Sequence, residues 1–263
     1  MRDPWEGVDE RGRIVTGAAR FRVPGAFEPV LEAALATVNK IDPAADLLLY
    51  GSVATGQAVV GRSDVDLLAV GLSAEAAGAI TRELSVRFAG LCRSVEVGAV
   101  GRHEYVGDGD IPYGNRVFRR HYGVPLTRPD RPDEPPYPAD RRAARAFNGD
   151  LARHAAGWRA DPGTDRARLA RRVGRKTLLA VAGLVSIQDR TWTTDRESAA
   201  QRWAEVEPAW AGPLHTLFAW GESVVVPDRA ELAEALAADG VVAAVEASFA
   251  DRIGFWQDGA GSS

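Results

Sequence analysis

The chain has few of the residues and patterns that define several large classes of protein. Its 263 residues include a single cysteine, Cys92, so no disulfide can form within the chain. It has no apolar run long enough to span a bilayer and no basic-then-apolar signal segment, so we expect a cytoplasmic protein with no membrane partner. Its net charge of −4 at pH 7 disfavours a general nucleic-acid binder.

Several catalytic signatures are also missing. The histidines share no metal-ligand spacing, which disfavours a zinc site, and no Gly-x-Ser-x-Gly elbow of serine hydrolases occurs. Gly51 and Gly56 have the glycine spacing of a P-loop, but Gln57 and Ala58 follow where a lysine and a serine or threonine are required. A P-loop nucleotide site is therefore excluded.

A glycine-serine turn follows a short apolar run. Leu47, Leu48, Leu49 and Tyr50 predict a buried strand, and Gly51 then allows a sharp turn into a segment that can begin a helix. The free N–H groups of such a turn and the Ser52 hydroxyl can donate hydrogen bonds to phosphate oxygens. These residues predict a turn that binds phosphate, although an ordinary turn would look the same in isolation.

A pair of carboxylates follows shortly afterwards. Asp64 and Asp66 lie in a predicted strand, where residues two apart point to the same face. Two carboxylates suit Mg²⁺, which usually takes one or two protein carboxylates and completes its shell with water and substrate phosphates. A solvated strand end is the alternative for this pair alone, but the two motifs together predict a site for a nucleoside triphosphate and a metal.

The order apolar-Gly-Ser, a short gap and Asp-apolar-Asp resembles the nucleotidyltransferase superfamily related to DNA polymerase beta. The resemblance implies that Gly51 and Ser52 bind the nucleotide, while Asp64 and Asp66 bind Mg²⁺, with two ions present when ATP is bound. It also implies a third acid on a neighbouring strand. Glu96, between two valines of a β-prone segment, is the best candidate as metal ligand or catalytic base. The alternatives are that Glu96 only faces water, or that Glu83, Glu104 or Asp108 is the third acid.

Composition changes along the chain predict two domains. We expect a lead-in at 1–25, an α/β (α+β) nucleotidyltransferase domain with a mixed sheet at 26–127 and a proline-rich linker at 128–140, where repeated prolines exclude helix and sheet interior. An α-helical bundle domain at 141–257 and a flexible tail at 258–263 follow. In the first domain helices are predicted at 26–41 and 73–88; in the second, near 141–158, 164–187, 195–206, 209–223 and 228–250.

This domain order resembles the aminoglycoside adenylyltransferases that modify streptomycin and spectinomycin. The segment from Thr194 to Trp203 looks like an inter-helix turn of that family, which implies that Arg196 reaches the triphosphate. A second basic residue from the preceding helix has the same role in the family, and Lys176, Arg172 and Arg175 compete for it here. The basic face that these residues form with Arg168 has two other interpretations, a solvated surface and a contact for an RNA backbone.

The resemblance predicts an enzyme that transfers AMP from ATP to a hydroxyl of a small molecule and releases pyrophosphate. An aminoglycoside-like acceptor would make it an antibiotic-resistance enzyme, and such a cation needs acidic and aromatic contacts. The candidates are Trp158, Asp189, Trp192, Asp195, Glu205 and Glu207. Two alternatives remain open: a nucleotidyltransferase-fold antitoxin or regulator that modifies or binds a partner protein, and a fold that binds nucleotide without reaction.

Overall fold

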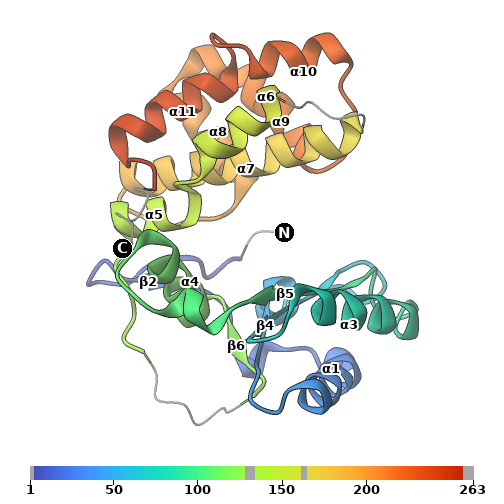
Figure 1. Ribbon diagram of the computed structural model, residues 1–263. Helices are drawn as coiled ribbons and strands as arrows, with labels where there is room; N and C mark the ends of the chain where they lie inside the picture. The colour runs from blue at the N-terminus through green and yellow to red at the C-terminus, as the bar shows by residue number, and fades with distance from the viewer. Residues whose placement is uncertain (1–2, 128–133, 161–164, 257–263) are drawn as a thin grey trace, which may run out of the picture. The chain divides into compact units, whose positions relative to one another are not determined.

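The computed structural model describes residues 3–127, 134–160 and 165–256. These form two compact units, which we describe separately (Figure 1). The first unit comprises Met1–Glu6 and Ile14–Tyr137, and the second comprises Gly7–Arg13 and Pro138–Ser263. The boundary at Tyr137 falls inside the linker predicted at 128–140, of which 128–133 lie outside the described residues. The tail predicted at 258–263 also lies outside them.

The N-terminal segment is part of both units rather than only a lead-in. Its first strand, β1 (Gly7–Val8), belongs to the second unit, and β2 (Ile14–Val15) belongs to the first. Within the second unit, Arg13 forms a bridge with Pro138, and the backbone N–H of Ala139 donates to the carbonyl of Gly12 at 2.9 Å. Residues 7–13 are thus hydrogen-bonded to the start of the helical region.

The first unit contains a mixed four-stranded sheet, as predicted from the sequence. Its strands are β3 (Asp46–Tyr50), β4 (Val65–Val70), β5 (Val95–Val100) and β6 (Val124–Pro125), in the order β5-β4-β3-β6. β4 and β5 are parallel, whereas β3 is antiparallel to both of its neighbours. A parallel pair needs a long crossover connection, and α3 (Ala74–Arg87) supplies it between β4 and β5.

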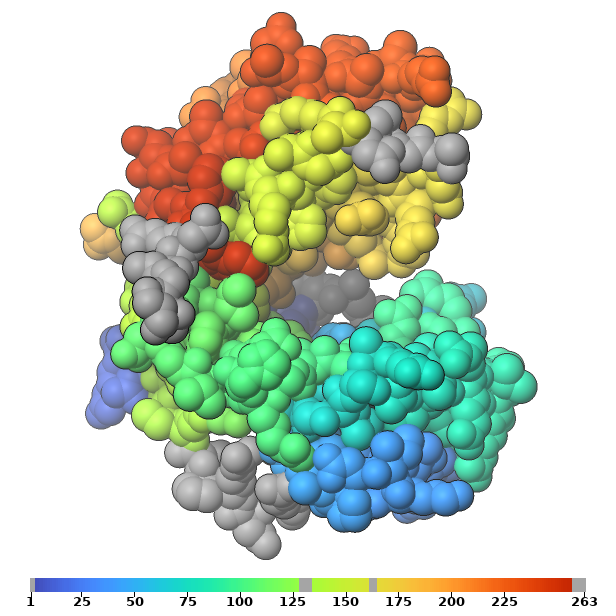
Figure 2. All heavy atoms as spheres, in the orientation of Figure 1, coloured from blue at the N-terminus to red at the C-terminus, as the bar shows by residue number. Residues whose placement is uncertain are grey.

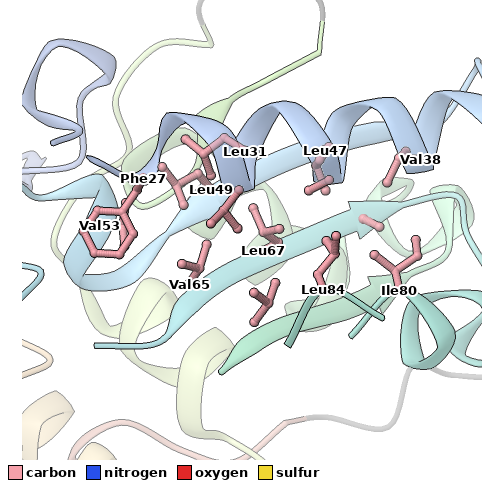
Figure 3. Close-up of a cluster of buried hydrophobic side chains, with 14 of the residues drawn as sticks. Phe27, Leu31, Val38, Leu47, Leu49, Val53, Val65, Leu67, Ile80 and Leu84 are labelled. Atoms are coloured by element: carbon pink, nitrogen blue, oxygen red, sulfur yellow. The ribbon is translucent and has the colours of Figure 1, made fainter. Parts of the chain in front are cut away.

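One face of the sheet is covered by α3 and α1 (Glu28–Ile41). The two helices also pack against each other (Figure 2). Alternate strand residues, including Leu49 and Leu67, point into this core and are fully buried. Figure 3 shows them facing Leu31 of α1 and Leu84 of α3. Since each fully buried leucine contributes about 1.5–3 kcal/mol, this face is the main source of the unit's stability.

The remaining elements of the first unit lie in the connections. They are η1 (Arg20–Arg22), η2 (Gly25–Phe27), the single turn α2 (Gly51–Ala54), η3 (Arg102–Tyr105) and α4 (Asp110–His121). Sequence analysis predicts neither α4 nor β6. Pro112 and Gly114 in the first turns of α4 obscure its pattern, although Tyr113, Val117 and His121 are buried at intervals of four residues.

The second unit is built from helices. They are α5 (Arg141–Asn148), α6 (Leu151–Ala160), α7 (Arg166–Gln188), α8 (Arg196–Val206), η4 (Pro208–Trp210), α9 (Ala211–Gly221), α10 (Arg229–Leu236) and α11 (Val241–Arg252). Two predicted helices are each divided in two, at Gly149–Asp150 and at 237–240. Aspartates cap α5, α7, α8 and α10 by accepting a backbone N–H of the first turn.

α7 is the central helix of this unit and contacts α5, α6, α8, α9 and α11. Its approach to α9 depends on glycine, because a Cβ on Gly174 would overlap the carbonyl of Leu217. α6, α10 and α11 pack together on another side (Figures 1 and 2). Within residues 3–127, 134–160 and 165–256, no helix combines the length and apolar character needed to cross a bilayer.

Candidate active site

Two acids and a tyrosine form a row across three strands of the sheet. Asp66 of β4 pairs in register with Glu96 of the parallel strand β5, and with Tyr50 of the antiparallel strand β3. Residues opposite each other in register project to the same face. Their neighbours Leu49, Leu67 and Val97 pack in the core, so this row lies on the face opposite α1 and α3. We call this face, which also carries Asp64, the acidic face.

The register places Glu96, the predicted third acid, directly beside Asp66. Its side chain is exposed, so it both faces water and belongs to the acidic face. The other candidates lie elsewhere: Glu83 is on α3, Glu104 accepts a hydrogen bond from the backbone N–H of Gly101 at 2.8 Å, and Asp108 is in the loop before α4. Glu96 is therefore the candidate that shares a register position with the aspartate strand.

The Gly51 turn lies against the carboxylate of Asp66. Gly51 has a φ of +73°, and a Cβ at this position would overlap the Asp66 carboxyl group. Glycine is required here both for the left-handed backbone and for the close approach. Ser52, which follows in α2, is half-buried. The predicted phosphate-binding turn and the predicted metal ligand are therefore adjacent.

Asp64 is held by a basic residue that sequence analysis did not select. Arg93 Nε donates to Asp64 Oδ1 at 2.9 Å, and the Arg93 Nη2 group pairs with Asp64 Oδ2. Ser94 Oγ also donates to Asp64 Oδ1, at 2.7 Å. The hydrogen bonds with Asp64 raise the pKa of Arg93, and the charges of Glu96 and Asp66 add to this effect. Arg93 is thus a counter-charge for Asp64.

Tyr50 adds a neutral hydrogen-bond donor to the acidic face. Burial raises the pKa of its hydroxyl to about 12, and the negative charges of Asp66 and Glu96 contribute to the shift. Its ring packs edge-on against Phe118 of α4, with 5.2 Å between the ring centroids. Tyr50 therefore stays protonated at neutral pH. The sequence predicted only that Tyr50 ends a buried strand.

The acidic face carries carboxylates of the kind that bind Mg²⁺. Within the described ranges, no three histidine, cysteine, aspartate or glutamate side chains are arranged together as a metal-binding group. However, Asp66 and Glu96 are neighbours, and Mg²⁺ needs only one or two protein carboxylates when water and phosphates complete its shell. Asp64, which already accepts hydrogen bonds from Arg93 and Ser94, is a third carboxylate of the same face.

The two predicted basic residues lie in the second unit, and each has an acidic partner there. Lys176 Nζ is 2.5 Å from Asp150 Oδ1, and Arg196 Nη2 donates to Glu222 Oε1 at 2.7 Å. Of their competitors, Arg172 is exposed, whereas Arg175 Nε donates to the Gly221 carbonyl at 3.1 Å. Any contact of Lys176 or Arg196 with a triphosphate would compete with these ion pairs.

Most candidates for the acceptor pocket have structural roles. Asp189 accepts two hydrogen bonds from Arg202, which also pairs with Glu205, and Asp195 caps α8. Trp158 and Trp192 are buried.

The chain matches no protein-family model, and a search of the curated proteins finds no significant match. Its likeness to nucleotidyltransferases is therefore one of motifs.

Proposed function

We propose that the chain is a Mg²⁺-dependent nucleotidyltransferase that transfers AMP from ATP to a hydroxyl of a small molecule and releases pyrophosphate. The observation that supports this best is the register of β3, β4 and β5, which brings Tyr50, Asp66 and Glu96 into one row beside the Gly51 turn. A phosphate-binding turn next to a pair of carboxylates is what transfer of a phosphoryl-type group requires.

The residues of this site have separate roles in the proposal. The backbone of Gly51 and the Ser52 hydroxyl would bind phosphate oxygens, and the carboxylates of Asp66, Glu96 and Asp64 would hold the metal. A bound Mg²⁺ would neutralise charge on the phosphates. Tyr50, protonated at neutral pH, supplies a neutral hydroxyl in the same row. These groups orient the α-phosphate for attack by the acceptor.

Glu96 is the proposed base for the acceptor hydroxyl. Its side chain is exposed, so an acceptor can approach it from solvent, and its position beside Asp66 places it next to the metal ligands. A general base must come within hydrogen-bonding distance of the proton that it removes. The acceptor in the proposal is a small hydroxylated compound, and aminoglycosides are the first to test.

The resemblance also implies that Lys176 and Arg196 are triphosphate ligands. Both make ion pairs with acids of their own unit, so a triphosphate must replace Asp150 at Lys176 and Glu222 at Arg196. Lys176 and Arg196 are only partly exposed, with side-chain exposures of 19% and 24%. Binding of a triphosphate by Lys176 and Arg196 thus requires both ion pairs to break, so we give these two residues a smaller role in the proposal than the acidic face.

The test is pyrophosphate release in the presence of Mg²⁺ from each common nucleoside triphosphate, with aminoglycosides, other hydroxylated natural products or no acceptor. Asp66→Asn is the inactive control. Asp42→Asn is the matched control, because Asp42 is an acid of the same unit that pairs with Arg102 away from the site. We expect release that needs an acceptor and is lost only in Asp66→Asn.

A different result would change the proposal in a defined way. Release that persists in Asp66→Asn would remove the metal-binding role of that residue. Binding of ATP and Mg²⁺ without release on any small acceptor would favour the alternative function, an antitoxin or regulator that modifies or binds a partner protein.

A further inference from the structure

Arg93 is a basic side chain in direct contact with the acidic face. It forms a two-point contact with Asp64, and the charges of Glu96 and Asp66 act on the same guanidinium. Such a fork of parallel N–H groups matches a carboxylate and matches a phosphate equally well. Arg93 therefore has the chemistry to bind either partner.

The contact between Arg93 and Asp64 can be exchanged without moving the backbone. The Arg93 side chain is 64% exposed, whereas the Asp64 side chain is only 15% exposed. Ion pairs with such an exposed partner contribute little to stability and are easily broken. In contrast, the Arg93 backbone N–H donates to the Ser63 carbonyl at 3.0 Å, and Val65 N–H donates to the Ser94 carbonyl at 2.9 Å. The guanidinium can move while its Cα stays beside Asp64.

Asp64 keeps its orientation when Arg93 leaves. Ser94 Oγ donates to Asp64 Oδ1 at 2.7 Å, so this carboxylate oxygen stays hydrogen-bonded when the Arg93 guanidinium moves away from Oδ2. A carboxylate fixed by a neighbouring hydroxyl is better placed to bind a metal than a mobile one. Arg93 and a divalent cation thus compete for the same carboxylate.

We propose that Arg93 exchanges partners during nucleotide binding: it neutralises Asp64 in the nucleotide-free protein, yields that carboxylate to the divalent cation, and then binds phosphate oxygens of the triphosphate. This rests on the proposed function, because it assumes that a triphosphate and a cation meet at the acidic face. It adds a nucleotide-binding residue from the first unit to Gly51 and Ser52, and the exchange keeps the local charge balanced at each stage.

The experiment measures two affinities separately in the full chain. The first is the affinity for Mn²⁺ without nucleotide, measured by the loss of the free-ion signal in electron paramagnetic resonance. The second is the affinity for the α,β-methylene analogue of ATP with Ca²⁺, measured by calorimetry. The variants are Arg93→Ala and Arg93→Lys. The matched control is Arg102→Ala, since Arg102 is an exposed arginine of the same unit that pairs with Asp42 at 3.3 Å.

The two affinities should change in opposite directions. Arg93→Ala should bind Mn²⁺ roughly threefold more tightly, because a weak competing ion pair is removed. It should bind the ATP analogue about tenfold more weakly, because charged hydrogen bonds to phosphate are lost. Arg93→Lys should recover part of the analogue affinity, since lysine keeps the charge but not the fork. Arg102→Ala should match the wild type in both measurements.

Each contrary result has one meaning. Equal Mn²⁺ affinity in the wild type and Arg93→Ala, or a change of both affinities in the same direction, overturns the exchange, even if the wild type binds the analogue well. If neither the wild type nor Arg102→Ala binds the analogue with Ca²⁺, the proposed function fails, and the phosphate-binding role of Arg93 fails with it. The Mn²⁺ measurement still decides whether Arg93 competes for Asp64.

Discussion

The two faces of the four-stranded sheet use the same strands for opposite purposes. On the core face, Leu49 and Leu67 are fully buried beneath α1 and α3. On the acidic face, Tyr50 and Asp66 occupy the next positions along the same two strands. Because strand side chains alternate, residues next to each other in sequence are separated by the full thickness of the sheet. Stability and the proposed chemistry can therefore be changed independently.

The acidic face also differs from the core in how its interactions could be exchanged. The packing of Leu67 in the core cannot be exchanged for another partner, because removing this side chain leaves a cavity. In contrast, Asp64 is bound through hydrogen bonds to the exposed Arg93, and Glu96 is itself exposed. Like charges placed together favour a bound cation. A rigid core face beneath exchangeable charged groups is a suitable arrangement for binding a charged substrate.

The largest expected effect comes from Asp66→Asn. The amide has nearly the same shape as the carboxylate, so the fold should be retained, but the central ligand of the acidic face loses its charge. We expect transfer to fall below detection while the thermal midpoint is unchanged or higher, because repulsion among the acids is reduced. Pyrophosphate release and differential scanning calorimetry measure the two effects. Full activity in the variant would refute the metal-binding role of Asp66.

Glu96→Gln should have the next largest effect. Loss of a general base typically slows a reaction by about 10²–10⁴-fold. Because Gly51, Ser52 and Asp66 are unchanged, ATP should still bind, although Mg²⁺ should bind more weakly because one of its carboxylate ligands is lost. Glu83→Gln, in an exposed glutamate of α3 on the other side of the sheet, is the matched control and should react at the wild-type rate. If Glu96→Gln reacted normally, the base would have to be another residue.

The sequence predicted the acidic face better than its surroundings. Alternation in Asp64–Val65–Asp66 and the flanking valines of Glu96 predicted that the acids lie on strands. The structure alone shows the register that pairs Asp66 with Glu96. Arg93 could not be found in this way. It lies in a turn, where no periodicity fixes the direction of a side chain, and its partner is far away in sequence.

The helices also differ from what the sequence predicted. The predicted segment at 228–250 is two helices, α10 and α11, because four residues ending in Gly240 interrupt it. A Cβ on Gly240 would overlap the Glu234 carbonyl, a contact between neighbouring turns that single-sequence patterns do not reveal. α4 was missed because Pro112 and Gly114 mask a helix whose buried face comes from tertiary packing.

Leu67→Ala tests the core face directly beside Asp66. Removing a fully buried leucine should lower the free energy of unfolding by about 2–5 kcal/mol. Activity per folded molecule should stay near normal at low temperature. Leu68→Ala is the matched control. Leu68 is the next residue on β4, lies on the acidic face and is only partly buried, so its replacement should lower the free energy of unfolding by a smaller amount. Chemical denaturation compares the two. An equal decrease in the free energy of unfolding for both variants would contradict the division of the sheet into a core face and an acidic face.

The smallest expected effect is a change in how stability depends on pH, and it concerns His121 at the end of α4. Phe118 of the same helix packs against Tyr50 of the acidic face. His121 is 7% exposed, and its Nε2 accepts a hydrogen bond from the Tyr137 backbone N–H at 2.9 Å. Burial lowers the pKa of His121 to about 4, and the nearby charge of Arg120 acts in the same direction. The folded protein therefore keeps this ring neutral and resists its protonation.

Stability should consequently fall as the pH falls from about 6.5 to about 4, because in this range the unfolded chain binds a proton that the folded protein does not. The loss from this residue is about 3 kcal/mol at most. His121→Gln can still accept the Tyr137 hydrogen bond but cannot titrate, so its free energy of unfolding should depend less steeply on pH. The exposed His215→Gln is the control and should keep the wild-type slope. Urea unfolding at several pH values decides: parallel curves for His121→Gln and the wild type would show that His121 is not kept neutral by burial.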